Sequence, residues 1–326
     1  MTEPILSVKD LTVQFPTRRG VLTAIDRISF DIMPGEVLGV VGESGAGKSM
    51  TSAAVIGLID PPGRIAGGEI RLSGERIDNL PEKGLRKIRG KRIGVIFQDP
   101  LTSLNPLYTV AEQLVETIQT HLPLNHAEAR KRAVGLLDEV GIPAAERRID
   151  DYPHQFSGGM RQRVVIALAL CAEPDLVIAD EPTTALDVSV QAQIIDVMKK
   201  LCAERGAAIM LITHDMGVIA ETADRVAVMY AGRIAEIGPV RDVIRNAKHP
   251  YTKGLMGSIP TLASELDRLV QIPGSMPRLS AIPRGCAFNP RCPEAFARCF
   301  IERPDPIDVD DQKVACWLYD RKEVAA

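Results

Sequence analysis

The stretch that decides the fold is Val37-Leu-Gly-Val-Val-Gly-Glu-Ser-Gly-Ala-Gly-Lys-Ser49. It begins with a short apolar run, typical of a buried strand, and continues directly into a glycine-rich segment. Residues 42–49 fit the pattern G-x-x-x-x-G-K-[ST], which predicts a loop that cradles phosphates at the start of a helix. We therefore expect a nucleotide-binding α/β fold.

Each residue type in this loop has a physical task. Glycines allow the backbone to approach phosphates closely, so that its N–H groups point at them. The Lys48 ammonium is expected to reach the β- and γ-phosphates, and the Ser49 hydroxyl to ligate Mg²⁺. The predicted ATP-binding residues of the loop are Gly42, Ser44, Gly45, Gly47, Lys48, Ser49 and Met50.

Strand and helix patterns alternate outward from this loop. Short apolar runs at residues 93–97, 176–179 and 208–213 predict strands, and residues 48–58, 110–140 and 190–205 have helical patterns. This alternation favours a parallel α/β core. Alternating residues at 6–32 and a hairpin-like stretch at 67–77 predict further strands. From about Pro250 onward, frequent prolines predict a separate, loop-rich tail.

A second chemical element is the strand Leu176-Val-Ile-Ala, which ends in Asp180-Glu181. Carboxylates at the C-terminal end of a buried strand can place a metal ion and a water molecule beside a ligand. We expect Asp180 to hold Mg²⁺ and Glu181 to act as the general base that polarises the attacking water.

The bulk composition excludes several classes of protein. The chain has 326 residues, 45% of them hydrophobic, and a net charge of −3, which gives no reason to expect nucleic-acid binding. No basic segment followed by a long apolar run opens the sequence, so no secretory signal is expected. Nothing approaches the roughly 20 consecutive apolar residues of a membrane-spanning helix, so a membrane role would require docking onto another protein.

Further motifs resemble those of the ABC ATPases. Phe156-Ser-Gly-Gly-Met-Arg-Gln-Arg163 resembles the signature motif, and Thr184-Ala-Leu-Asp187 resembles the D-loop. Gln98 matches the Q-loop glutamine and His214 the switch histidine, while Phe15 stands where this family places a ring against adenine. These motifs cover residues 1 to about 240, and the resemblance implies an ABC cassette: a P-loop α/β fold with a parallel core sheet, an antiparallel β subdomain and a helical subdomain at about residues 100–165.

The resemblance also implies roles for residues and partners. Glu181, His214 and Gln98 would be catalytic, and Gln98 would share Mg²⁺ with Ser49 and Asp180. The signature residues would act on ATP held by another cassette. These residues are Ser157, Gly158, Gly159 and Gln162. Asp187 would be the D-loop residue. A second ABC ATPase subunit is therefore expected, in a heterodimer or a homodimer.

The cargo follows only from finer resemblance. The segments FQDPLTSLNP, DEPTTALDV and His249-Pro-Tyr-Thr-Lys-Gly-Leu255 resemble the ATPases of oligopeptide and dipeptide importers. This implies two permease subunits, a solute-binding protein and a place at the cytoplasmic face of a bacterial inner membrane. Importers of this group also carry nickel, glutathione, murein peptides or sugars, and an exporter cassette or a soluble ABC ATPase are further alternatives.

Four cysteines crowd the predicted C-terminal region of residues 251–326, following an ATPase domain at 1–250. Their spacing contains no C-x-x-C, so the residues leave zinc, an iron–sulfur cluster and free thiols open. The resemblance to the peptide-importer ATPases implies a [4Fe–4S] cluster, with zinc as the alternative. The expected ligands are Cys286, Cys292, Cys299 and Cys316.

Overall fold

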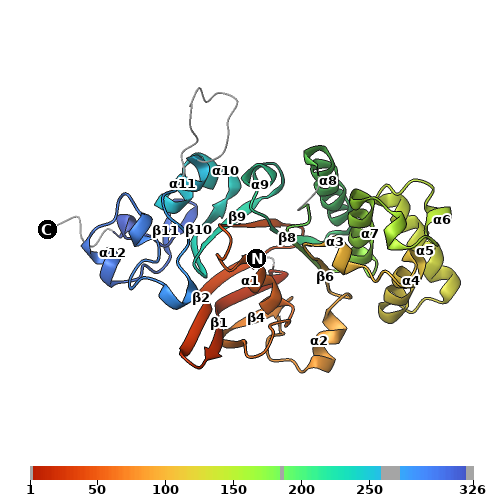
Figure 1. Cartoon of the computed structure of the whole chain (residues 1–326), viewed down its shortest axis with the longest axis horizontal. Coiled ribbons are helices and arrows are strands. Elements are labelled where there is room, and N and C mark those ends of the chain that lie inside the picture. Colours follow the sequence, from red (N-terminus) through yellow and green to blue (C-terminus); the bar gives the residue numbers. More distant parts are fainter. Residues whose placement is uncertain (1–2, 184–186, 258–271, 321–326) are drawn as a thin grey trace. The chain divides into compact units, whose positions relative to one another are not determined.

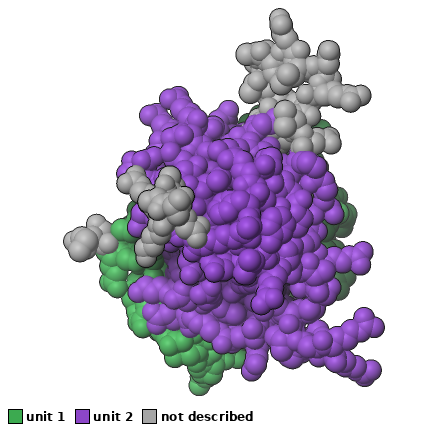
Figure 2. All heavy atoms as spheres, turned by 90° about the vertical axis from the view of Figure 1, so that its left-hand side faces the viewer, with its two compact units in different colours: residues 1–7, 31–37, 71–212 green, residues 8–30, 38–70, 213–326 purple. Residues whose placement is uncertain are grey.

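The computed structural model describes residues 3–183, 187–257 and 272–320. The chain divides into two compact units, which Figure 2 shows in different colours. Unit 1 comprises residues 1–7, 31–37 and 71–212, and unit 2 comprises residues 8–30, 38–70 and 213–326. Each unit is thus assembled from segments that are far apart in the sequence.

The sheet of unit 1 is parallel, as expected. Its strands are β6 (Ile93–Ile96), β7 (Leu176–Asp180) and β8 (Ala208–Ile212), in the order β8-β7-β6. Ile93 pairs with Leu176, and Leu176 pairs with Ala208. The strands are almost entirely buried because their sequences are continuous apolar runs, which suits parallel strands covered on both faces.

Helices make up most of the remainder of unit 1 (Figure 1). The helix α7 packs against β6, α4 and α5. The predicted helical stretch of residues 110–140 is two helices, because a turn that contains Pro123 separates α4 from α5. The helices are α2 (Glu82–Ile88), α3 (Pro100–Ser103), α4 (Val110–His121), α5 (His126–Glu139), α6 (Ala145–Arg148), α7 (Gly158–Leu170) and α8 (Val188–Arg205), and a short strand β5 (Glu75–Arg76) precedes them.

Unit 2 holds a mixed sheet. Residues 38–41 of β3 (Val37–Val41) pair in parallel with β9 (Arg225–Tyr230), and β9 pairs antiparallel with β10 (Arg233–Pro239). Beyond β10 come β12 (Gln312–Val314) and β11 (Ile307–Val309), both antiparallel. The parallel core predicted from the alternation therefore holds for β6, β7 and β8 and for β3 with β9, whereas the later strands turn back on one another.

Unit 2 also contains further strands and helices. The strands β2 (Gly20–Ile32), β1 (Leu6–Thr17) and β4 (Arg64–Leu72) are hydrogen-bonded in that order. The helices are α1 (Lys48–Val55), α9 (Met216–Thr222), α10 (Val240–Arg245), α11 (Pro250–Gly257) and α12 (Ala297–Ile301). None of the helices in the described ranges is both long and apolar enough to cross a bilayer.

The C-terminal region adds to the sheet of unit 2. Glu236 of β10 pairs with Val314 of β12, and the Val314 side chain is fully buried. The region is rich in short segments, as its prolines predicted, but its last strands extend the sheet (Figure 1). The boundary at residue 250 stays a prediction.

Candidate functional site

The phosphate loop lies between β3 and α1, as its sequence predicted. Gly42 and Gly47 have φ angles of 153° and 106°, in a region that favours glycine. A Cβ atom on Gly42 would lie 2.3 Å from the carbonyl oxygen of Met229, so the loop also needs glycine there for space. Gly47 is the residue before the first turn of α1, and the N–H groups at such a helix start can bind an anion.

Lys48 is held inside the loop. Its side chain is buried, and its Nζ donates hydrogen bonds to the carbonyl oxygens of Gly42 at 2.8 Å and Glu43 at 3.3 Å. The ammonium is therefore fixed at the centre of the curve that the backbone makes. Ser44, Gly45 and Ser49 are exposed and Met50 is half-buried, so the outer face of the loop is open to a ligand.

Two further predicted residues belong to the same unit as the loop. Phe15 of β1 is half-buried, and its ring edge would lie 2.5 Å from a Cβ atom on Gly63. His214 is exposed in the segment before α9. The structure thus assigns Phe15, the loop and His214 to unit 2, and assigns Gln98, Asp180, Glu181 and Ser157 to unit 1.

In unit 1, Gln98 and Glu181 are in direct contact. The Nε2 of Gln98 donates a hydrogen bond of 2.9 Å to Oε2 of Glu181. Glu181 has φ of 47°, which is rare for a residue with a side chain, and its N–H donates to the carbonyl of Ile212 at 2.8 Å. Asp180 precedes it as the last residue of β7 and is half-buried. A strained, hydrogen-bonded backbone therefore sets the direction of the Glu181 carboxylate.

The signature segment forms the start of α7. The Ser157 hydroxyl accepts a hydrogen bond from the N–H of Met160 at 3.4 Å, which caps the helix. Ser157 and Gly158 are exposed and Gly159 is half-buried. Gln162 differs, because it is 1% exposed and its Nε2 makes no hydrogen bond within the described residues.

Asp187 is exposed and immediately precedes α8. The preceding D-loop residues 184–186 lie outside the described residues. The role of Asp187 in the D-loop therefore stays a prediction.

The four C-terminal cysteines line one pocket. Cys286, Cys292, Cys299 and Cys316 share it with His249, Phe288 and Trp317. Burial raises the pKa of the Cys286 thiol to about 11 and that of the Cys316 thiol to about 12. No three metal-ligating side chains in the described ranges have the geometry of a formed metal site. The four thiols are thus gathered in one pocket, without a preformed cage.

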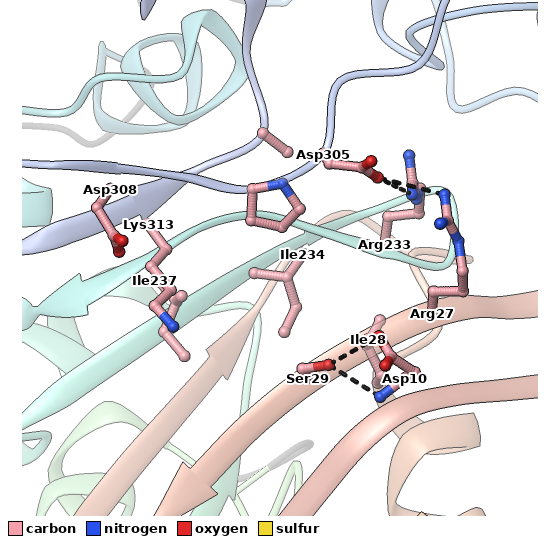
Figure 3. A pocket seen from close by; sticks show the side chains of 12 residues that line it. Asp10, Arg27, Ile28, Ser29, Arg233, Ile234, Ile237, Asp305, Asp308 and Lys313 are labelled. Atoms are coloured by element: carbon pink, nitrogen blue, oxygen red, sulfur yellow. Dashed lines mark hydrogen bonds and ion pairs between the residues drawn. The ribbon is translucent and has the colours of Figure 1, made fainter. Parts of the chain in front are cut away.

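A charged pocket of about 370 Å³ occupies another part of unit 2, between β2, β10 and the C-terminal strands (Figure 3). Asp305 forms ion pairs with Arg27 at 3.2 Å and Arg233 at 3.6 Å. None of the residues predicted to bind ATP lines it. Because these charges neutralise one another, we assign no ligand to this pocket.

Sequence reasoning missed two residues that reach the phosphate loop. Tyr251 and Arg291 contact Glu43, from 208 and 248 residues away along the chain. No local pattern around either residue signals such a contact.

Comparisons with known proteins agree with this arrangement. Residues 25–184 match the family described as ABC transporter, and residues 235–299 match the family described as oligopeptide/dipeptide transporter, C-terminal region. The chain is 47% identical over 322 residues to the dipeptide transport ATP-binding protein DppD of Bacillus subtilis, covering 98% of this chain and 96% of that protein.

Two further similarities extend this picture. The chain is 50% identical to the oligopeptide transport ATP-binding protein OppD of Escherichia coli, covering 93% of this chain and 89% of that protein. Among solved structures, the ATP-binding cassette MJ0796, a dimer in a post-hydrolysis state with ADP and phosphate, is similar with a TM-score of 0.65 at 29% identity. That similarity covers 72% of this chain and 99% of the cassette.

Proposed function

Because the chain belongs to the ABC transporter ATPases of the oligopeptide/dipeptide transporter family, we propose that it drives the import of peptides by hydrolysing ATP. The chain is an ABC ATPase, and its predicted fold class is confirmed. One observation carries the proposal most directly: the buried Lys48 is fixed in a glycine-rich loop at the N-terminus of α1. That loop can bind the phosphates of ATP.

In the proposed site, ATP lies along the phosphate loop. Lys48 exchanges its bonds to loop carbonyls for bonds to the β- and γ-phosphates, and the N–H groups of residues 44–50 bind phosphate oxygens. Phe15 packs against the adenine. His214 contacts the γ-phosphate from the segment before α9.

The Mg²⁺ ligands in this proposal are Ser49, Gln98 and Asp180. All three offer oxygen donors, which Mg²⁺ prefers, and none is fully buried, so the donor set fits the ion in kind. When bound, Mg²⁺ neutralises phosphate charge and polarises the transferred group.

Glu181 is the proposed general base. Its carboxylate accepts a proton from the water that attacks the γ-phosphate, and the hydrogen bond from Gln98 holds one carboxylate oxygen in place. The other oxygen then faces the water. The strained backbone of Glu181 supports this role, because unusual backbone angles concentrate at functional sites.

The proposed assembly contains two cassettes. Ser157, Gly158 and Gly159 present a capped helix start, which suits the γ-phosphate of ATP held by a partner cassette. The partner is a second ABC ATPase subunit, either a different chain or another copy of this one. Two permease subunits and a solute-binding protein complete the importer, and the chain lies at the cytoplasmic face of a bacterial inner membrane.

A metal group at the C-terminal cysteines is a finer part of the proposal. Four thiols facing one pocket suit a [4Fe–4S] cluster or zinc in kind, although they do not form a cage in the described residues. Binding requires the loss of thiol protons, and the group would then join the segments that carry the cysteines. Anaerobic purification followed by iron, sulfide and zinc analysis tests this: iron and sulfide support the cluster, whereas a colourless protein rejects it.

The cargo is tested by reconstitution. The chain, its partner cassette and the permeases are placed in proteoliposomes with the solute-binding protein. Dipeptides and oligopeptides are expected to stimulate ATP hydrolysis and to accumulate inside in an ATP-dependent way. Stimulation by nickel, glutathione or sugars alone would reject peptides as the cargo.

A further inference from the structure

Glu43 of the phosphate loop is bound by the C-terminal region at two points. Its backbone N–H donates a hydrogen bond of 2.9 Å to the hydroxyl of Tyr251. Its carboxylate pairs with Arg291, with 3.0 Å between Oε2 and Nη1. Because the Glu43 carbonyl also accepts a bond from Lys48, one residue joins the phosphate-binding lysine to the C-terminal region.

Arg291 is fixed before it meets the loop. Its side chain is only 7% exposed, and its Nε donates to the carbonyl of Pro273 at 2.7 Å. Its Nη2 donates to the carbonyl of Ile272 at 3.4 Å, and the Nη1 that meets Glu43 also donates to the Tyr230 hydroxyl at 3.4 Å. Since these bonds use the fork of the guanidinium, little freedom remains for the nitrogen that meets Glu43. The ion pair is therefore rigid and largely shielded from water, unlike a surface salt bridge.

Tyr251 is held equally firmly. Its side chain is fully buried, and its ring lies against Tyr230 and Phe288, with centroids 4.6 and 5.4 Å apart. These edge and tilted contacts fix the direction in which the hydroxyl points. The hydroxyl thus meets the Glu43 N–H without rearrangement.

The segment that carries Arg291 also carries two of the pocket cysteines. Cys286 and Cys292 flank Phe288 and Arg291 in the sequence. The Cys286 N–H donates to the carbonyl of Cys299 at 2.9 Å, and the Asn289 side chain donates to the same carbonyl at 3.1 Å. The fold of the cysteine region therefore determines where Arg291 lies.

We propose that Tyr251 and Arg291 are positioning residues that hold Glu43, and with it the phosphate loop, in its anion-binding shape before ATP arrives. The C-terminal region thereby sets the affinity for ATP. The inference rests on the proposed binding of ATP at this loop. Its physical basis is that a loop already held in the bound shape loses less conformational freedom on binding.

The test measures the dissociation constant of Mg·ATP for the full-length chain and its variants. Arg291→Met removes the charge and keeps the stem, while Tyr251→Phe removes only the hydroxyl. Each is expected to weaken ATP binding by about tenfold, the scale of one lost hydrogen bond to a charged or fixed group. In the assembled transporter, KM should rise while kcat changes little.

Two matched controls separate positioning from general stability. Arg298→Met removes another arginine of the C-terminal region, which pairs with Glu302 and Asp320, and Tyr319→Phe removes a hydroxyl bonded to the Lys248 carbonyl. These partners all lie outside the phosphate loop, so both variants should keep the wild-type affinity. Thermal unfolding without nucleotide identifies any variant that is poorly folded.

A double-mutant cycle provides the second readout. Glu43→Gln should weaken ATP binding as Arg291→Met does, and the double variant should lose no more than either alone. Additive losses, or unchanged affinity in Arg291→Met and Tyr251→Phe, would overturn the positioning role. A wild-type chain that binds no Mg·ATP would instead overturn the proposed function on which the inference rests.

Discussion

The side-chain amide of Gln98 lies 2.9 Å from the carboxylate of Glu181, joining the end of β6 to the end of β7. The two residues are 83 positions apart, and the parallel pairing of their strands brings them together. The contact links the residue that follows one strand to the proposed general base after the next. A substitution of Gln98 should therefore alter the position or the charge of the Glu181 carboxylate.

Replacing Glu181 tests its proposed role directly. Glu181→Gln keeps the shape of the side chain but cannot accept the proton of water, so turnover should fall by about 10²–10⁴-fold. Binding of Mg·ATP should persist. ATP hydrolysis by the assembled transporter and nucleotide binding by the isolated chain measure the two effects. Glu204→Gln, at an exposed position of α8, is the control, and normal turnover in Glu181→Gln would exclude Glu181 as the base.

A carboxylate at position 98 should change the pH profile. Gln98→Glu replaces the hydrogen bond to Glu181 by a second negative charge, and two carboxylates so close together repel each other unless one of them holds a proton. The acidic limb of kcat should therefore move to higher pH. The profile of ATP hydrolysis is compared with that of Gln98→Ala, which removes the hydrogen bond without adding charge. Equal pH profiles of ATP hydrolysis for the two variants would show that the contact between residue 98 and Glu181 does not affect the hydrolysis step.

Lys48 should determine ATP affinity. Lys48→Met keeps an unbranched apolar side chain in the buried position but removes the charge that meets the phosphates. We expect at least about a 100-fold weaker binding of Mg·ATP, since a charge-assisted contact to two phosphates is lost. Titration calorimetry measures the change. Lys200→Met, on the exposed face of α8, should bind normally.

Glu236 should stabilise the segment that leads into the C-terminal region. Its fully buried carboxylate accepts hydrogen bonds from the N–H groups of Lys248 at 2.8 Å and His249 at 3.0 Å. Glu236→Ala leaves both donors without this acceptor, at a cost of about 2–4 kcal/mol in the free energy of unfolding. The control Asp308→Ala, at an exposed position of β11, should change the free energy of unfolding by less than about 0.5 kcal/mol. Denaturant unfolding compares the two.

His249 should make stability depend on pH. Burial lowers the pKa of this imidazole from 6.5 to about 4, and its Nδ1 accepts a hydrogen bond from the Tyr251 N–H at 3.0 Å. The unfolded chain therefore takes up a proton near pH 6.5, whereas the folded chain does so only near pH 4. The neutral His249 imidazole therefore makes its full contribution to the free energy of unfolding above pH 6.5. This contribution is lost as the pH falls toward 4, by up to about 1.4 kcal/mol per pH unit.

His249→Asn provides the matched variant, because its amide oxygen can still accept the Tyr251 N–H but does not titrate. The difference between the two proteins in the free energy of unfolding should change with pH over this window. A constant difference would show that His249 does not titrate as the structure indicates.

Local pattern and chemistry explain which features were predictable. The phosphate loop and the buried strands β3, β7 and β8 follow from short apolar runs and from glycine at fixed positions, and the structure confirms them. The division of residues 110–140 into α4 and α5 was also readable from Pro123, although the helical composition obscured it.

Long-range contacts were not predictable in the same way. The pairing of β12 with β10 joins strands separated by an entire proline-rich region, and β12 has only three residues, too few for a clear alternation. The contacts of Tyr251 and Arg291 with Glu43 likewise depend on how that region folds. Gathering of the four cysteines in one pocket was expected from their number, but the raised pKa values of the Cys286 and Cys316 thiols required the structure.

The assembly of unit 2 from both ends of the chain has a consequence for synthesis. The phosphate loop leaves the ribosome early, but residues 71–212 must be made before any of residues 213–326 appear. At roughly 5–20 residues per second, that interval lasts about 7–28 s. Throughout it the nascent chain has its phosphate loop but lacks the strand β9 beside β3 and both residues that hold Glu43. A nascent chain halted before residue 213 should therefore not yet retain ATP, however complete its glycine-rich loop.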